Sequence, residues 1–278
     1  SEVNLPKMQE GMLDGIFLAA YMAQGPRDEK SLIDAVKYAG VIIDSIYNQV
    51  EKNKTLCDIA LTTGDLVRLK NEGRKAIFIG IENRGVNYMT LCHTKNNDIC
   101  DSSSDSIAEW GGLSPFGYKV IREMNKLGMI IDLSHASENT FWDVIKESNA
   151  PVVVTHSSVR ALCDHDRNLT DMQMKALAQI NGVMQLCPVD IFITKSGKNA
   201  SLEQFIDHID YAVKLIGVNH VGIGSDFDGG GGLIGLRGAN DMMNITITEE
   251  DISKILGGNF LRVMNDVQSK TDERIVTS

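Results

Sequence analysis

Short apolar runs rich in β-branched residues recur along the chain and alternate with longer stretches of mixed polarity. Each run has the length of a buried strand, and several are bounded by glycine or proline. Runs of this kind, separated by helix-length segments, are typical of a parallel sheet whose strands are covered by helices. The pattern predicts strands at residues 15–21, 76–82, 86–91, 128–134, 151–155, 182–187 and 220–225.

The stretches between these runs have helical spacing. Within residues 116–127, Val120, Met124 and Leu127 fall on one face. Gly128 follows directly, and glycine is the residue that most often ends a helix. Strand and helix alternate without a break in composition, so we expect one α/β barrel domain over residues 1–278. Seven strands are one short of a closed barrel, and we therefore expect its first strand to be absent from this sequence.

Composition narrows the function classes. The chain is 43% hydrophobic and 23% charged, and it has no apolar run approaching the roughly 18 residues of a membrane-spanning helix. The net charge of −10 disfavours nonspecific attraction to nucleic acid or anionic lipid, which leaves a small molecule or a peptide as the expected partner. Five cysteines without a C-x-x-C pair predict free thiols rather than a disulfide framework or a thiolate zinc site.

Two histidines follow apolar runs directly. His135 directly follows the run at 128–134, and His156 directly follows the run at 151–155. All strands of a parallel barrel point their carboxyl ends at one mouth, so we expect the two imidazoles to meet there and to bind a metal. Glu82 and His93 also stand at predicted strand ends.

Other polar residues extend this candidate site. Asp226, after the last predicted strand, is placed for proton transfer beside a metal-bound water. Arg167 is either a solvated loop charge or a fork for a substrate carboxylate. The glycine run after Asp228 is either a flexible loop or a cradle for phosphate. The remaining histidines lack a strand-end position, and we interpret His208 and His220 as structural.

At these residues the chain resembles the membrane dipeptidase (renal dipeptidase) family of zinc metallopeptidases, peptidase family M19. The matching segments run in family order over nearly the whole chain, and the long block that ends at Ser137 is the most specific. The segments are 79–83, 89–93, 112–117, 123–137, 155–158, 167–169, 222–229 and 258–261.

The resemblance implies a (β/α)8 barrel of the metal-dependent hydrolase kind with two zinc ions. It implies hydrolysis of dipeptides, including L,D-dipeptides, by a hydroxide that bridges the metals, and it implies a homodimer. It leaves the compartment open, and we expect a soluble, cytoplasmic protein rather than a secreted or lipid-anchored one. By motif, Glu82 resembles the ligand that bridges the two zinc ions, and His135 and His156 resemble ligands of the second zinc. His93 resembles the residue that binds the substrate and the oxyanion, and Arg167 resembles the residue that binds the substrate carboxylate. Asp226 resembles the proton-transfer residue near the substrate amine.

The sequence also departs from the family pattern. The first strand of the family ends in His-x-Asp, which supplies ligands to the first zinc, and no predicted strand of this sequence ends in this motif. The segments after Asn83 and near Asn244 are shorter than in the family. We expect that parts of a longer protein are left out before Ser1 and at these two places. Two alternatives follow: a non-catalytic barrel that binds a peptide or metabolite after loss of one metal site, and a phosphate-ester hydrolase that uses the glycine run.

Overall fold

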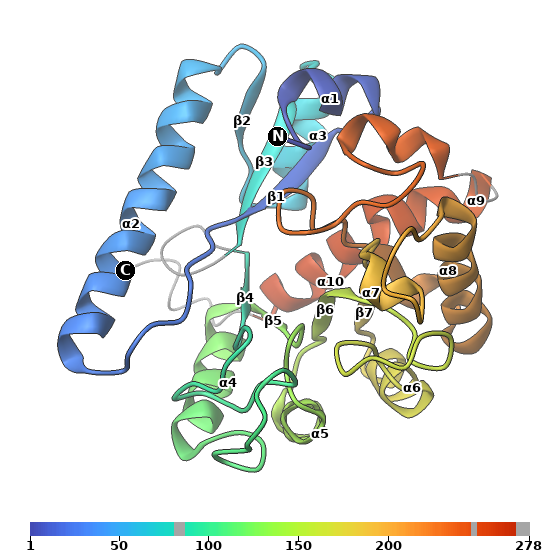
Figure 1. Cartoon of the computed structure of the whole chain (residues 1–278). Coiled ribbons are helices and arrows are strands. Elements are labelled where there is room, and N and C mark those ends of the chain that lie inside the picture. The colour runs from blue at the N-terminus through green and yellow to red at the C-terminus, as the bar shows by residue number, and fades with distance from the viewer. Residues whose placement is uncertain (81–86, 246–248, 271–278) are drawn as a thin grey trace.

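The computed structural model describes residues 1–80, 87–245 and 249–270. Its strands pair in parallel and form one curled sheet in the order β1-β3-β4-β5-β6-β7-β8, with β2 paired to the beginning of β3 (Figure 1). The strands are β1 (Gly15–Ala19), β2 (Cys57–Ile59), β3 (Lys75–Gly80), β4 (Tyr88–Thr90), β5 (Ile130–Asp132), β6 (Val153–Ser157), β7 (Val183–Leu186) and β8 (Val221–Ile223).

Helices surround this sheet, and their ends follow the local sequence. In α4 the Ser114 side chain accepts a hydrogen bond from the Gly117 amide, and Pro115 occupies the first turn, where its missing N–H costs nothing. Gly128 ends α4 at a φ of 67°, as the sequence predicts. The α-helices are α1 (Leu5–Glu10), α2 (Glu29–Lys52), α3 (Thr63–Asn71), α4 (Pro115–Leu127), α5 (Glu138–Glu147), α6 (Asp171–Gln179), α7 (Asp190–Ile193), α8 (Leu202–Ile216), α9 (Glu249–Ser253) and α10 (Asn259–Gln268), with shorter turns at Val218–His220, Ala239–Asn244 and Lys254–Gly258.

The predicted α/β architecture is confirmed, with one strand that the pattern missed. Each of the seven apolar runs contains a strand, whereas β2 is three residues long and has no apolar run to reveal it. Within the described residues β1 and β8 do not pair with each other, so the sheet is an open, curled half-barrel. Glu82 and Asn83, on which two of the expectations rest, lie outside the described residues.

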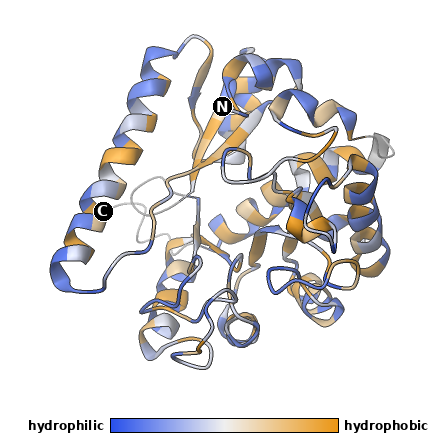
Figure 2. Cartoon of the chain, viewed as in Figure 1, coloured by the Kyte–Doolittle hydropathy of each residue, from blue (hydrophilic) through white to orange (hydrophobic). Residues whose placement is uncertain are grey.

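The inner face of the sheet carries polar side chains at the carboxyl ends of β5 and β6. Side chains alternate along a strand, so Asp132 shares a face with Ile130, and Thr155 shares a face with Val153. Ile130 and Val153 pack with Phe260 and other apolar residues of α10 in one buried cluster. Figure 2 shows hydrophobic residues concentrated on the strands and on the helix sides that face them. Along β5 and β6 the side chains on the inner face therefore change from apolar to polar toward the carboxyl end of the strand.

Candidate metal and catalytic site

The polar side chains predicted from strand ends do lie at one edge of the sheet. His93, His135 and Asp226 each stand three residues beyond the end of β4, β5 and β8, and His156 is within β6. Parallel strands deliver their carboxyl ends to the same edge, which is where barrels carry their active sites. Glu82 follows β3 but lies outside the described residues, so its predicted role as bridging ligand is not placed.

The two histidines that define the prediction are in direct contact. The Nε2 atoms of His135 and His156 are 2.8 Å apart. The ring of His93 packs on His135 with centroids 4.1 Å apart, and the ring of Tyr21 lies 5.0 Å from that of His93. Three imidazoles from three successive strand ends therefore share one site, as their spacing in the sequence suggested.

Hydrogen bonding determines which nitrogen of His156 carries its proton. The Thr155 hydroxyl donates to Oδ2 of Asp132 over 2.7 Å, and it also lies 2.8 Å from Nδ1 of His156. Its single hydrogen is used on Asp132, so the hydroxyl accepts from Nδ1–H of His156. Nε2 of His156 is then unprotonated, with its lone pair directed at His135. That is the tautomer a metal-binding imidazole needs.

Asp132 organises this arrangement, and strand-end reasoning overlooked it. Its carboxylate is fully buried and accepts hydrogen bonds from the Ser134 amide and hydroxyl, the Thr155 amide and hydroxyl, and the Thr90 hydroxyl. A buried carboxylate is tolerated only when its lone pairs are satisfied in this way. An aspartate that ends an apolar run was the available signal, in the segment Ile-Ile-Asp-Leu-Ser-His.

Electrostatics keep both contacting histidines neutral. Burial, helped by the charge of Arg167, holds the pKa of His135 far below its ordinary value. Burial also lowers the pKa of His156, to about 4, and outweighs the opposing effect of Asp132. Neutral imidazole is the form that coordinates metals, and of the two rings His156 already has its Nε2 free of a proton.

The backbone at His135 is under constraint. Its φ is +69°, in the left-handed region that residues other than glycine rarely adopt, and its Nδ1 is buried without a hydrogen-bond partner. Strain of this kind collects at functional sites because the surrounding structure must hold it in place. We infer that the fold keeps His135 in this strained conformation because it directs the imidazole ring toward His156, and not because it stabilises the protein.

The donor set fits a metal only in part. Two nitrogens on one tetrahedral zinc are about 3.3 Å apart, so His135 and His156 would need to separate by only about half an ångström. Among the residues that the structure describes, no group of three or more histidine, cysteine, aspartate or glutamate side chains is arranged to hold a metal ion. The described part of the chain thus brings two candidate ligands, His135 and His156, into contact and does not complete a metal site by itself.

Arg167 brings a buried positive charge to the site. The residue is buried, its Nη2 donates to the backbone carbonyl of His156 over 3.1 Å, and its guanidinium lies 5.3 Å from the ring centroid of Phe192. Its Nε is buried and has no hydrogen-bond partner within the described residues. Since burying an uncompensated charge is costly, this guanidinium is suited to an anionic group of a bound molecule.

Asp226 adds a carboxyl group that binds a proton more readily than an exposed aspartate does. Burial raises its pKa, against a smaller opposing effect from Arg167. Its φ is +50°, and its carbonyl accepts hydrogen bonds from the amides of Gly229 and Gly231. The Gly232 amide is bound to the Pro188 carbonyl. These three glycine amides are already used inside the protein, so the glycine run offers little support for a phosphate cradle.

The other histidines have structural partners. Nδ1 of His208 accepts from the Val159 amide, and its Nε2 lies 3.2 Å from the Ile193 carbonyl. Nδ1 of His220 lies 2.9 Å from the Gly182 carbonyl. These contacts agree with the structural interpretation made from the sequence.

A parallel half-barrel with imidazoles and carboxyl groups at its strand ends defines the metal-dependent hydrolase class of barrels. The model of the membrane dipeptidase family, peptidase family M19, matches residues 1–275. The chain therefore belongs to this family of metallo-dipeptidases.

Individual relatives agree with this assignment. The dipeptidase tcpJ of Claviceps purpurea is 32% identical over 295 residues, which cover 96% of this chain and 69% of that protein. The dipeptidase verJ of Clonostachys rogersoniana is 31% identical over 302 residues, covering 96% and 76%. The crystal structure of the probable dipeptidase PvdM from Pseudomonas aeruginosa superposes with a TM-score of 0.89 at 27% identity, over 97% of this chain and 90% of that one.

A more distant structure confirms the fold alone. It is a metallo peptidase from Rhodobacter sphaeroides liganded with a phosphinate mimic of the dipeptide L-Ala-D-Ala, and it matches with a TM-score of 0.86 at 20% identity, over 95% of this chain and 90% of that one. Within the described residues no helix combines the length and apolar character that crossing a membrane requires.

Proposed function

We propose that this chain is a zinc-dependent dipeptidase that cleaves dipeptides, L,D-dipeptides among them, with a hydroxide held between two zinc ions. The observation that carries the proposal is the 2.8 Å approach of the His135 and His156 Nε2 atoms, with His156 in the metal-binding tautomer. Membership of a family of dipeptidases supports the choice of substrate.

The residues that would hold zinc are His135 and His156 for one ion, with Glu82 as the bridge to the other. When bound, zinc lowers the pKa of a water molecule from about 16 to about 7, so that hydroxide is available at neutral pH. The chain's own contribution is to present two neutral imidazoles in fixed directions. Asp132 and Thr155 supply that direction for His156.

Substrate binding uses the buried positive charge. Arg167 binds the terminal carboxylate of the dipeptide through N–H groups that the described part of the protein leaves unpaired, such as Nε. His93, whose ring packs on His135, donates a hydrogen bond to the carbonyl oxygen as negative charge develops there. The substrate is bound at two points, its terminal carboxylate at Arg167 and its peptide carbonyl at His93. The separation of these two residues limits the length of substrate that fits.

Proton transfer completes the reaction. As the new C–O bond forms and the peptide C–N bond breaks, the leaving nitrogen needs a proton. Asp226 supplies it, because burial raises the pKa of its carboxyl group and so favours the form that holds a proton. The products are two free amino acids.

Zinc content tests this proposal against the non-catalytic alternative. Protein loaded with zinc and freed of excess metal is analysed by inductively coupled plasma mass spectrometry, with His135→Ala as the matched control. The proposal predicts about two zinc ions per chain of the intact protein and loss of metal in the variant. One zinc or none in the unmodified protein favours a binding protein that has lost a metal site.

We also propose that residues 1–278 form one barrel domain and that the protein has further segments, left out of this sequence, after Asn83 and near Asn244. The 295-residue alignment with the Claviceps dipeptidase, longer than this chain of 278 residues, supports the second point. Five buried, free cysteines suit a reducing compartment, and we propose a cytoplasmic location. Intact mass spectrometry of the purified protein tests the missing segments, since a mass near 30.5 kDa would exclude them.

A further inference from the structure

We propose that Arg27 is a positioning residue for the reaction: it fastens residues 20–28 to the loop that carries His93 and so keeps Tyr21 packed on the His93 ring. Residues 20–28, the strap, join β1 to α2, and residues 91–114, the His93 loop, join β4 to α4. This role rests on the proposed function, because His93 is the group that binds the carbonyl oxygen there.

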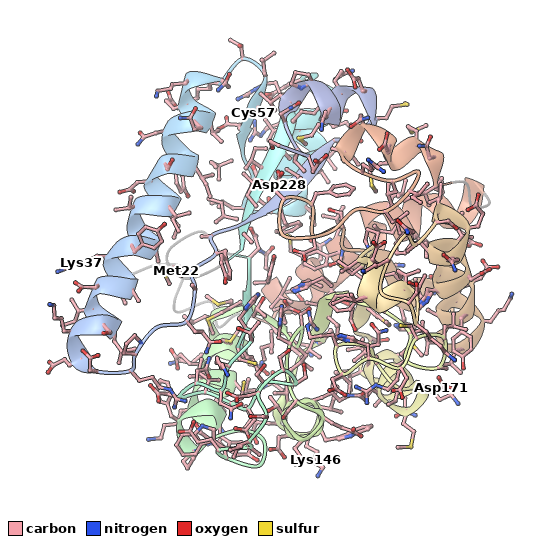
Figure 3. The ribbon with its side chains drawn as sticks, viewed as in Figure 1. Met22, Lys37, Cys57, Lys146, Asp171 and Asp228 are labelled. Carbon is pink, nitrogen blue, oxygen red and sulfur yellow. The ribbon has the colours of Figure 1, made fainter. Side chains whose placement is uncertain are left out.

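The strap is fixed to the sheet at its first residue. Ala20 is fully buried, and its amide donates to the Gly80 carbonyl over 3.1 Å, which continues the pairing of β1 with β3. Beyond it, Tyr21 is 52% exposed, Met22 is partly buried, and residues 23–28 are exposed. Figure 1 shows the strap leaving the sheet and running to the beginning of α2, and Figure 3 labels Met22 on it. Since the strap buries so little apolar surface, polar contacts must hold it in place.

Two side chains of the strap make such contacts, and both bind the His93 loop. Oε1 of Gln24 accepts from the Lys95 amide over 2.9 Å, and Nε2 of Gln24 donates to the Asn96 carbonyl over 3.4 Å. Nη2 of Arg27 donates to the same carbonyl over 3.0 Å. The guanidinium also binds Glu109 through two bonds, Nη1 to Oε1 over 2.9 Å and Nη2 to Oε2 over 2.6 Å.

The Arg27 contact differs from an ordinary surface ion pair. Most exposed pairs contribute little because solvent screens them and two side chains must be ordered. Arg27 binds Glu109 in the bidentate geometry that is strongest for arginine, and Asp98 lies 3.3 Å from Nη1 as a second carboxylate. Arg27 and Glu109 are 82 residues apart in the sequence, so the contact joins two separate segments rather than neighbours on one helix.

The His93 loop connects this contact to His93 itself. The carboxylate of buried Asp101 accepts from the Glu109 amide over 2.9 Å, and the hydroxyl of the next residue, Ser102, donates to the His93 carbonyl over 2.5 Å. The Ser102 amide donates to the Asn96 side chain over 2.8 Å. The loop is therefore braced internally, and its position at Glu109 and Asn96, where Arg27 binds, is coupled to its position at His93.

The ring of His93 lies between two other rings. Its centroid is 5.0 Å from that of Tyr21 and 4.1 Å from that of His135. Tyr21 directly follows the anchored Ala20, and Arg27 holds the other end of the strap. The two anchors keep Tyr21 on His93 and thereby fix the direction of the imidazole. This direction matters for the rate, because misplacing a catalytic group by about 1 Å can cost about 100-fold.

Exchanging the two charges tests the proposal in zinc-loaded protein. Arg27→Glu sets like charges together and should lower kcat for a dipeptide by about tenfold or more with KM nearly unchanged, because His93 acts on the transition state. Glu109→Arg should act in the same direction. The double variant Arg27→Glu/Glu109→Arg should recover most of kcat, since opposite charges meet again. Arg68→Glu is the matched control, because Arg68 is an exposed arginine with two carboxylate partners, Asp65 and Glu72, that are local to α3.

Hydrogen exchange followed by mass spectrometry gives a readout that does not depend on activity. In metal-free protein, peptides that cover the strap and Lys95 should exchange faster in Arg27→Glu, because the Lys95 amide is bound by Gln24 of the strap. Exchange should slow again in the double variant, and peptides from α5 should exchange at the same rate in all variants.

The outcomes separate this role from the proposed function. A selective fall in kcat, its recovery in the double variant and faster exchange confined to the strap and the His93 loop support the positioning role. Dipeptide hydrolysis with a kcat that Arg27→Glu leaves unchanged, or that the double variant does not recover, overturns this role alone; a lower free energy of unfolding with unchanged kcat marks a structural contact only. Zinc-loaded unmodified protein that cleaves no dipeptide overturns the proposed function and the positioning role together, whatever the exchange shows.

Discussion

The hydroxyl of Thr155 connects Asp132 to His156, and replacing Thr155 with valine tests whether that connection prepares the metal site. Valine keeps the branched shape of threonine and removes only the oxygen. His156 then loses the acceptor for its Nδ1–H, and the tautomer with a free Nε2 is no longer favoured. We expect zinc affinity to fall by about 10- to 100-fold, the usual effect of removing a group that orients a metal-binding histidine.

The magnitude agrees with the contacts in the structure. The Thr155 hydroxyl lies 2.7 Å from the Asp132 carboxylate and 2.8 Å from His156. A hydrogen bond to a charged group contributes about 1.5–3 kcal/mol. A 10- to 100-fold loss of affinity corresponds to about 1.4–2.7 kcal/mol, which is one such bond.

Thr90 provides a matched control for this variant. Its hydroxyl donates to the same Oδ2 atom of Asp132 over 2.6 Å but has no contact with His156. Thr90→Val should therefore lower the free energy of unfolding, as Thr155→Val does, while leaving zinc affinity nearly unchanged. The assay is zinc competition with a chromophoric chelator, combined with urea unfolding of the metal-free proteins. Equal losses of zinc affinity in the two variants, or no loss in Thr155→Val, would refute the reasoning.

Further predictions concern individual side chains. His135→Ala should abolish zinc retention and dipeptide hydrolysis together, measured by metal analysis and amino acid release. Arg167→Ala should raise KM for a dipeptide far more than it lowers kcat, because the substrate carboxylate loses its partner. Asp226→Asn should lower kcat by about 100-fold or more with little change in KM. Burial lowers the pKa of His208, so folding favours its neutral form. Its contribution to the free energy of unfolding is therefore complete above about pH 6.5 and is lost as the pH falls. Between about pH 7.5 and about pH 5.5, urea unfolding should show a smaller decrease of this free energy in His208→Gln than in the unmodified protein.

The sequence predicted the strands because each apolar run is long enough to be a buried strand of a parallel sheet. It did not predict β2, because Cys57–Ile59 pairs with β3 over only three residues and has no apolar pattern of its own. Short strands of this kind depend on a neighbour that is distant in the sequence, so local pattern does not reveal them.

The site was predictable to the extent that it lies at strand ends. His135 and His156 were expected to meet because parallel strands share one edge, and their nitrogens do meet. The network behind them was not predictable in the same way. Asp132 and Thr155 act through hydrogen bonds between neighbouring strands, and the register of those strands is known only from the structure. Phe192 beneath Arg167 is a further contact that only the fold reveals.

Release of free amino acids from a panel of dipeptides by zinc-loaded protein tests the central claim most directly. The panel should include L-Ala-D-Ala beside its L,L counterpart, with metal-free protein as the control. We predict hydrolysis that requires zinc and that His135→Ala abolishes. No release of amino acids from any member of the panel, by protein shown to hold its zinc, would contradict it.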